Sequence, residues 1–381
     1  MERGARTLKA VVIHHDLSAR GGGEKVCVTV LELLHEMGFD ISLVTISPPK
    51  IEEIKKAFGK DVSFVKEVHK LLPFRLRMFG IYQRMFTLIP SLRVEGDICL
   101  VTHGDVYPYL TSKIPTISYC YFPVVALIQK MYPSKYQHGF WRAYFEPYRM
   151  TVGLLMGFAM KRNVVVTISK FSYNAIKELF GVDSIIIPPP VDVETFSKAF
   201  SREKEEDLII SLGRYAPEKK HEYAIYVLSK LPKNVRLKVI GTLAPTAVTY
   251  YNYLKRYAEK LGVADRVELV HDIPLNELLD IMSRAKVLFH GYRGEHFGLA
   301  VAEAMAAGLI PVVWDYGGQS EFTPKEYQFH TLEEAPKAVM KALEASPSER
   351  EKVHKIAWNF SEEKFKKRFA FLIRSVLKMA K

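Results

Sequence analysis

Short, nearly continuous apolar runs recur along the chain, and a segment with helical periodicity follows most of them. The runs are Leu8–Ile13, Ile41–Ile46, Ile98–Val101, Thr116–Cys120, Val164–Ile168, Ile185–Ile187, Leu208–Leu212, Leu237–Ile240, Val267–Val270, Val287–His290 and Pro311–Trp314. Apolar strands that alternate with helices predict parallel sheets covered on both faces. Two such series in tandem therefore predict an α/β protein with two doubly wound domains.

The boundary between the two series is expected at the proline run Pro188–Pro190. Three consecutive prolines suit an extended connector, because proline cannot continue a helix or a central strand. We therefore expect domains at residues 1–190 and 191–381. A final helix is expected over about 361–381, where Ser361 has the character of an N-cap residue.

Charge and composition narrow the class of protein. The chain has 381 residues and a formal net charge of +12, which favours anionic partners. Only three cysteines occur, no apolar run reaches the length of a membrane span, and no leader is evident, so a cytoplasmic protein is expected. Asparagine and glutamine total only 11, which hints at a thermophilic source.

A glycine-rich segment, Gly21–Glu24, lies between the first strand and an apolar helix expected from Val26. Glycines let a backbone approach a ligand closely, and the helix N-terminus that follows attracts anions. A flexible turn is an equally good interpretation of this segment alone.

A second segment, Gly213–Lys220, follows the strand at Leu208–Leu212. Arg214 and Lys219 lie five residues apart around a turn, so together they have the chemistry to bind a diphosphate. A solvated basic loop is the alternative.

A third segment, Gly291–Gly308, follows the strand that ends at His290. Residues from about Leu299 to Ala307 are strong helix formers, and Gly308 suits the position after the helix. Glu295 precedes this helix and Glu303 lies inside it, where a buried, unpaired carboxylate would be costly. An acidic pair around a helix N-terminus suits a sugar diphosphate, whereas an exposed or cation-paired Glu303 is the alternative.

Taken together, these segments resemble glycosyltransferase family 4, whose members are retaining enzymes with the GT-B fold. Glu295-x7-Glu303 matches the family's E-x7-E motif, and Gly213-Arg214-x4-Lys219 is similar to its phosphate loop. The resemblance implies two Rossmann-like domains that face each other across a cleft, with the final helix packed back on the N-terminal domain.

The resemblance also implies roles for single residues. Arg214 and Lys219 would hold the donor diphosphate and Glu295 the donor sugar, which makes these three the catalytic residues, and Glu303 would bind the ribose. The other donor-binding residues would be Phe297, Gly298 and Leu299 through their N–H groups, Gly22 and Gly23 from the other domain, and Asp272 and Ile273 near the base. The donor is a nucleotide-diphosphate sugar, and neither a bound metal nor another cofactor is expected.

The segment Ser118–Pro123 is similar to one found in mannosyltransferases that extend lipid-linked oligosaccharides. Those enzymes commonly have a histidine where Tyr121 stands, so Tyr121 and the loop residue His103 are the candidates on the acceptor side. Mannose is therefore the first expectation for the hexose, and a glycan or polyprenyl-linked acceptor is implied.

Two apolar segments could bring the protein to an anionic membrane surface on its cytoplasmic side. Phe74–Phe86 mixes Arg75, Arg77 and Arg84 with large apolar residues, and Val152–Met160 is followed by two basic residues. Ordinary core-facing helices are the alternative in both cases.

Other functions remain open from the sequence alone. A nucleotide-sugar epimerase of the same fold, a transferase using UDP-glucose or UDP-GlcNAc with a soluble acceptor, and an inactive sugar-binding member are each compatible with parts of the pattern. A nucleic-acid-binding protein is not expected, because the basic residues are scattered and match no nucleic-acid motif.

Overall fold

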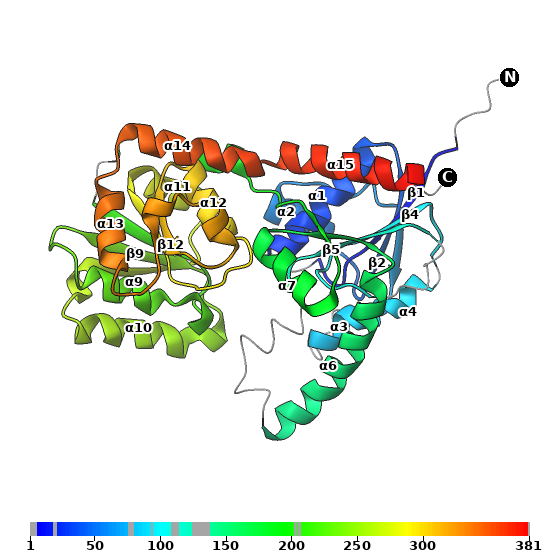
Figure 1. The fold of residues 1–381 in the computed structure, drawn as a ribbon, viewed down its shortest axis with the longest axis horizontal. Helices are drawn as coiled ribbons and strands as arrows, with labels where there is room; N and C mark the ends of the chain where they lie inside the picture. Colours follow the sequence, from blue (N-terminus) through cyan, green and yellow to red (C-terminus); the bar gives the residue numbers. More distant parts are fainter. Residues whose placement is uncertain are drawn as a thin grey trace. The chain divides into compact units, whose positions relative to one another are not determined.

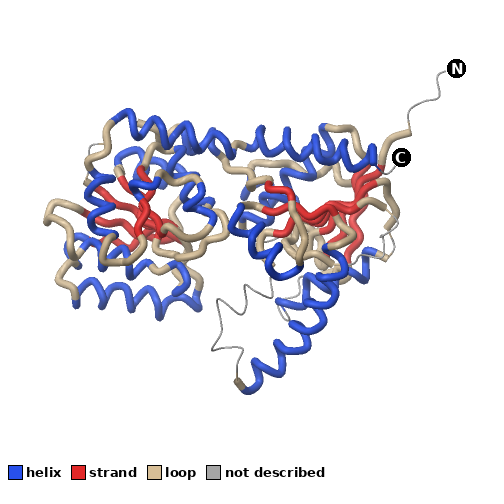
Figure 2. The backbone as a smooth tube through the Cα atoms, viewed as in Figure 1, coloured by secondary structure: helices blue, strands red, loops and turns tan. Residues whose placement is uncertain are grey.

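The computed structural model describes residues 6–17, 21–74, 80–92, 94–107, 114–123, 138–201, 204 and 207–379. It divides into two compact units. Unit 1 comprises Met1–Pro190 together with Glu363–Lys381, and unit 2 comprises Val191–Glu362. In each unit a central sheet lies between layers of helices (Figures 1 and 2).

Unit 1 contains a seven-stranded sheet in the order β3-β2-β1-β4-β5-β6-β7, in which all strand pairs are parallel. Its strands are β1 (Lys9–Ile13), β2 (Asp40–Thr45), β3 (Glu67–Lys70), β4 (Ile98–Val101), β5 (Thr116–Cys120), β6 (Val164–Thr167) and β7 (Ile185–Ile186). Its helices are α1 (Gly22–Glu36), α2 (Ile51–Phe58), α3 (Gly80–Phe86), α4 (Leu88–Ser91), α6 (Gly139–Met160), α7 (Lys170–Phe180) and most of α15 (Glu362–Met379). Helices α1 and α15 cover one face of the sheet and α6 the other (Figure 1).

Unit 2 contains a six-stranded parallel sheet in the order β10-β9-β8-β11-β12-β13. Its strands are β8 (Leu208–Leu212), β9 (Arg236–Gly241), β10 (Val267–His271), β11 (Val287–His290), β12 (Ile310–Trp314) and β13 (Gln328–Phe329). Its helices are α8 (Val193–Ser197), α9 (His221–Leu228), α10 (Val248–Lys260), α11 (Leu275–Arg284), α12 (Leu299–Ala306), α13 (Ala335–Leu343) and α14 (Pro347–Ala357). Helices α9 and α10 lie on one face of the sheet, and α12 and α14 on the other (Figure 1).

The predicted α/β class and the two doubly wound sheets are confirmed, and every predicted apolar run is a strand. Two of the four edge strands, β3 and β13, were not predicted, because neither is an apolar run. Strand β3 is mostly exposed, and a hydrogen bond from Ser42 Oγ to Glu67 Oε2 (2.7 Å) ties it to β2. Polar cross-strand bonding stabilises this edge where apolar burial does not.

The final helix, α15, packs on unit 1 through one apolar face. The rings of Phe365 and Phe369 both lie 6.1 Å from the ring of Tyr119 on β5. Lys366 forms ion pairs with Glu32 and Glu36 of α1, at 2.5 Å and 2.7 Å. Sequence positions more than 300 residues apart are therefore joined within one unit.

Among the described residues, no helix has both the length and the apolar content needed to cross a membrane.

Candidate functional site

Two loops of unit 2 leave the carboxyl edge of the sheet at the point where the strand order reverses. Strands β8 and β11 are neighbours, and the chain continues to β9 on one side and to β12 on the other. Ligands of open α/β sheets bind at such a switch point. The loop after β8 carries Arg214 and Lys219, and the loop after β11 carries Glu295.

Lys219 and Glu295 meet at this edge. The Lys219 Nζ donates a hydrogen bond to Glu295 Oε2 at 2.9 Å, and the two side chains are 22% and 18% exposed. Burial alone would raise the pKa of Glu295, but Lys219 and the nearby His290 and His296 hold it well below its usual value. Glu295 is therefore a charged carboxylate in a largely dry position, with its cation beside it.

A buried histidine, His221, holds the loop after β8, which carries the diphosphate-binding candidates Arg214 and Lys219. His221 is 1% exposed, and its Nδ1 lies 2.9 Å from Ser211 Oγ while its Nε2 lies 3.2 Å from the Arg214 carbonyl. Because a carbonyl oxygen can only accept a hydrogen bond, the Nε2 of His221 carries the proton and donates a hydrogen bond to the Arg214 carbonyl. Burial lowers the pKa of His221 to about 4, so the ring is neutral.

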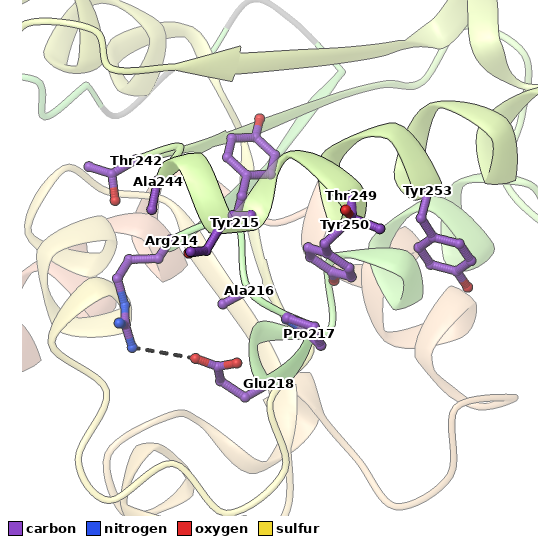
Figure 3. Close-up of a pocket in the computed structure, with 12 residues that line it drawn as sticks. Arg214, Tyr215, Ala216, Pro217, Glu218, Thr242, Ala244, Thr249, Tyr250 and Tyr253 are labelled. Carbon is purple, nitrogen blue, oxygen red and sulfur yellow. Dashed lines mark hydrogen bonds and ion pairs between the residues drawn. The ribbon is translucent and has the colours of Figure 1, made fainter. Parts of the chain in front are cut away.

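Arg214 has its ion-pair partner in its own loop. Its guanidinium lies 3.4 Å from Glu218 Oε1, and the Arg214 side chain is 71% exposed. Figure 3 shows the two side chains pointing toward each other. Arg214 lines a cavity of about 530 Å³ together with Tyr215, Glu218, Thr242 and side chains from the start of α10. The structure thus brings Lys219 to Glu295 and places the Arg214 side chain at a separate opening.

Helix α12 begins directly after Gly298, as predicted. Gly298 has a φ of 101°, a left-handed conformation that suits glycine, and a Cβ there would lie 2.9 Å from Gln319 Cβ. The Phe297 side chain is buried against Phe322 and Phe360, so this residue faces the loop through its backbone. Leu299 is the first helical residue, and its position aims the N–H groups of the first turn at the loop.

Glu303 lies in the middle of α12 and is half-buried, while most of its helix is fully buried. Gly317 and Gly318 approach the backbone of residues 295–297 from the loop after β12. The Gly318 N–H donates to the Glu295 carbonyl at 2.6 Å. This second glycine pair, absent from our predictions, holds the Glu295 loop in place.

Asp272 and Ile273 follow β10 at the same edge of the sheet. Asp272 has a φ of 56°, and its Oδ1 accepts from the Leu243 N–H at 3.4 Å. Its Oδ2 lies 3.2 Å from His271 Nδ1. Asp272 therefore links the loops after β9 and β10, and Ile273 beside it is half-buried.

In unit 1 the glycine segment is part of a helix. Helix α1 begins at Gly22, so Gly22 and Gly23 form its first turn, and the predicted start at Val26 is wrong by about one turn. Glu24 explains the early start, because its Oε2 accepts from the Gly21 N–H at 3.0 Å and satisfies a free donor of that turn.

A buried polar network continues from α1 across the carboxyl edge of the first sheet. His14, directly after β1, lies 4.0 Å from Glu24 Oε1 and 3.0 Å from Thr102 Oγ1. The Tyr121 hydroxyl donates to the Thr102 carbonyl at 2.6 Å and lies 3.1 Å from the Gly23 carbonyl. The predicted acceptor-side residue Tyr121, at the end of β5, thus links the first turn of α1 to the end of β4.

The predicted residue His103 is 1% exposed and lies inside unit 1. Its ring is 6.1 Å from that of His15 and 5.7 Å from that of Tyr107, and its Nδ1 accepts from the Asp105 N–H at 3.3 Å. Burial holds the pKa of His103 well below its usual value. His103 is therefore a neutral ring in a cluster of histidines.

The basic segment expected at a membrane is only partly described. Arg75 and Arg77 lie outside the described residues. Arg84 turns inward and pairs with Asp105 at 3.2 Å, whose side chain is fully buried. The buried Asp105 carboxylate thus has the Arg84 cation beside it, and membrane binding by this segment stays a prediction.

The second apolar segment lies in α6, a helix with two apolar faces. Phe145, Tyr148, Val152 and Met156 are buried in the core of unit 1. The opposite face exposes large apolar side chains. These are Phe140, Met150, Leu154 and Phe158, with exposed fractions of 74%, 61%, 76% and 51%. The Arg162 guanidinium lies over the Phe158 ring at 4.2 Å.

Four residues that shape these sites were not predicted: His14, Glu24, His221 and His290. His14 and His290 stand at the carboxyl ends of predicted strands, and that position was the available signal. His221 gave none, because a histidine that starts a helix is an ordinary surface residue in most sequences. Within the described ranges, no cluster of histidine, cysteine or acidic side chains is arranged to hold a metal ion.

Two family models match the chain, one in each half. The model described as "Glycosyltransferase Family 4" matches residues 20–195, and "Glycosyl transferases group 1" matches residues 192–360.

The curated relatives include enzymes named GDP-Man:Man(3)GlcNAc(2)-PP-Dol alpha-1,2-mannosyltransferase. The human protein is 35% identical over 170 residues, which cover 41% of this chain and 35% of that protein. The Neurospora crassa protein is 24% identical over 336 residues, which cover 72% of this chain and 59% of that protein. The matches thus span a third to three fifths of the relatives' own length.

Solved structures share the fold over the whole chain. Anabaena HepE, in complex with UDP and glucose, has a TM-score of 0.68 at 14% identity and covers 97% of this chain and 100% of its own. Sucrose-phosphate synthase from Thermosynechococcus elongatus has a TM-score of 0.73 at 14% identity with the same coverage. At this identity the likeness establishes the GT-B fold.

Proposed function

Because the chain belongs to glycosyltransferase family 4, we propose that it is a retaining hexosyltransferase that moves mannose from GDP-mannose to a lipid-linked oligosaccharide. The observation that carries the proposal is the meeting of Lys219 and Glu295 at the switch point of the second sheet. One cation suited to a diphosphate and one carboxylate suited to sugar hydroxyls lie within 2.9 Å of each other there. The names of the relatives support the choice of mannose and of a lipid-linked acceptor.

In this proposal the protein stabilises the charge of the leaving group. The bond between the anomeric carbon and the phosphate oxygen breaks, and its electrons pass to the nucleoside diphosphate. Lys219 and the N–H groups at the start of α12 are positioned for that charge, and preorganised groups of this kind supply the largest single contribution in many enzymes. Arg214 joins them by turning from Glu218, a movement that its 71% exposure allows.

The acceptor hydroxyl attacks from the face that the phosphate leaves, so the new bond keeps the anomeric configuration. Its proton passes to the departing phosphate oxygen, and no protein nucleophile takes part. Glu295 orients the hexose through its hydroxyl groups, and Glu303 and Asp272 bind the nucleoside. Tyr121 and the His103 cluster belong to the acceptor side of this scheme.

A lipid-linked acceptor requires access to a membrane surface, and α6 offers a suitable face. Its exposed apolar stripe carries Phe140, Met150, Leu154 and Phe158, and Lys161 and Arg162 follow at its end. An apolar helix face flanked by cations suits the interface of an anionic bilayer. We therefore place peripheral membrane binding at α6, on the cytoplasmic side.

Donor choice and turnover test the enzymatic proposal. Calorimetric titration of the full chain with GDP-mannose, UDP-glucose and UDP-GlcNAc should show binding of GDP-mannose alone, and transfer of labelled mannose to a polyprenyl-diphosphate-linked oligosaccharide should follow. Glu295→Gln should abolish transfer without changing the far-UV circular dichroism, while Glu268→Gln, on the exposed part of β10, should leave transfer intact. Preference for a UDP-sugar would replace the donor assignment, and interconversion of the sugar without transfer would identify an epimerase.

Vesicle flotation tests the membrane face. Leu154→Glu/Phe158→Glu should reduce binding to vesicles of phosphatidylcholine with phosphatidylglycerol. The matched double variant Val248→Glu/Leu275→Glu adds the same charge at exposed apolar residues of unit 2 and should leave flotation unchanged. Equal flotation of the two variants would exclude α6 as the contact.

A further inference from the structure

Two nitrogen groups, the Lys219 ammonium and the His290 ring, converge on one oxygen of Glu295. Its Oε2 lies 2.9 Å from Lys219 Nζ and 3.5 Å from His290 Nε2, while its Oε1 accepts from the His296 N–H at 3.2 Å. The hydrogen bond from the His296 N–H holds the carboxylate through Oε1. The other side therefore presents a single oxygen to two competing donors.

His290 is the rigid member of this group. It is the last residue of β11 and is 3% exposed. Its Nε2 is buried and makes no hydrogen bond in the described structure. A buried ring nitrogen without a partner is costly, so a small approach to Glu295 would be favourable. The distance of 3.5 Å is the outer limit of such a bond.

Lys219 is the movable member. Its side chain runs along Gly213, where a Cβ would lie only 3.3 Å from two of its methylene carbons. Its ammonium lies 5.5 Å from the centre of the Tyr292 ring and is close enough to the surface to leave its side chain 22% exposed. A long aliphatic stem over a glycine can swing without repacking the core.

We propose that Glu295 exchanges partners when a sugar diphosphate binds, passing from Lys219 to His290. The inference rests on the proposed function and adds a positioning residue, His290, to it. Lys219 turns from the carboxylate to the diphosphate, and the His290 Nε2–H then donates to Glu295 Oε2. Hydrogen bonds from His290 and from the His296 N–H then hold the Glu295 carboxylate toward the hexose hydroxyls, and the carboxylate does not follow the Lys219 ammonium.

The exchange couples recognition of the diphosphate to recognition of the sugar. A nucleoside diphosphate without a hexose breaks the ion pair between Lys219 and Glu295 and supplies no hydroxyl donor to the carboxylate. An intact sugar diphosphate supplies hydroxyl donors to that carboxylate. After transfer, Glu295 competes again for Lys219, so the ion pair promotes release of the nucleoside diphosphate product.

The first test measures binding of GDP, with UDP in parallel, by titration calorimetry of the full chain. Glu295→Gln removes the negative charge that competes with the diphosphate for Lys219, so GDP should bind to this variant about threefold to tenfold more tightly than to wild type. In a Lys219→Met background, Glu295→Gln should give no gain. Glu268→Gln breaks another Lys–Glu pair of unit 2, with Lys238 at 2.7 Å, and controls for the change in net charge.

The second test concerns His290 and compares the dissociation constants of GDP and GDP-mannose. His290→Phe should lower the preference for GDP-mannose over GDP at least fivefold while leaving GDP binding near wild type. His290→Gln presents an amide N–H near the position of Nε2 and should restore the preference. A residue that only fills space would give both variants the same preference.

The outcomes separate the two proposals. If wild type binds GDP-mannose but Glu295→Gln binds GDP no more tightly, or if His290→Phe keeps the preference, the exchange is wrong and the proposed function stands. If wild type binds neither nucleoside diphosphate nor any sugar diphosphate of the panel, both fail.

Discussion

His221 should make unit 2 sensitive to acid, and the size of the effect follows from its surroundings. Burial lowers the pKa of His221 to about 4 in the folded chain, against 6.5 for an ordinary histidine. Between these values the unfolded chain binds a proton that the folded chain does not, so the contribution of His221 is fully present above pH 6.5 and is lost as the pH falls toward 4. The difference of about 2.5 between the two pKa values corresponds to roughly 3 kcal/mol of unfolding free energy.

The test compares wild type with His221→Phe in guanidinium unfolding followed by circular dichroism from pH 4 to pH 8. At pH 8 the variant should be less stable by about 1–3 kcal/mol, because Ser211 and the Arg214 carbonyl lose their buried partner. On acidification to pH 4 the difference in unfolding free energy should shift by roughly 3 kcal/mol in favour of the variant, since the variant has nothing to titrate at this position. Because both proteins contain the other histidines, the titration of those residues cancels in the difference of the two unfolding free energies. A gap independent of pH, or a His221 ring that titrates near 6.5 by NMR, would refute the reasoning.

Three further predictions concern stability. Arg84→Met should lower the free energy of unfolding by about 3–5 kcal/mol, since it leaves the fully buried Asp105 carboxylate without its cation; a urea midpoint near that of wild type would contradict this. Gly104→Ala should cost more than about 1 kcal/mol in the same assay, because φ is 97° and the new Cβ would lie 2.4 Å from Tyr121 Cδ2, and a Tyr121→Ala background should recover part of the loss. Lys204→Met should cost at least about 2 kcal/mol, because the buried ammonium donates to the carbonyls of Ala199, Met282 and Ala307 at 2.8–3.1 Å, and an unchanged thermal midpoint would show that these bonds contribute little.

The sequence predicted the central strands because a run of apolar residues such as Val287–Phe289 is buried on both faces of its sheet, and any apolar residue serves there. Helix α12 was predictable for a similar reason, since Gly298 and Gly308 mark both its ends. The edge strand β3 was not, because its stability comes from a hydrogen bond between Ser42 and Glu67, which lie far apart in the sequence.

The candidate site was predictable only where a motif has fixed spacing. The resemblance to the family implied that Lys219 and Glu295 bind one donor. The direction of Arg214 was not predictable, because Glu218, four residues on, pairs with it. The inward turn of Arg84 was equally hidden, since its partner Asp105 lies 21 residues away and only the folded chain brings them together.

The bond between Val191 and the end of the same unit has a consequence for how this chain is assembled. The Val191 N–H donates to the Phe360 carbonyl at 2.9 Å, and Val191 forms an isolated parallel bridge with Ser361. The entry and exit points of unit 2 are thus adjacent, as in a domain inserted into a host loop. Residues 191–362 therefore occupy the place of an insertion within unit 1, and adjacent termini are the arrangement in which domain insertion is tolerated.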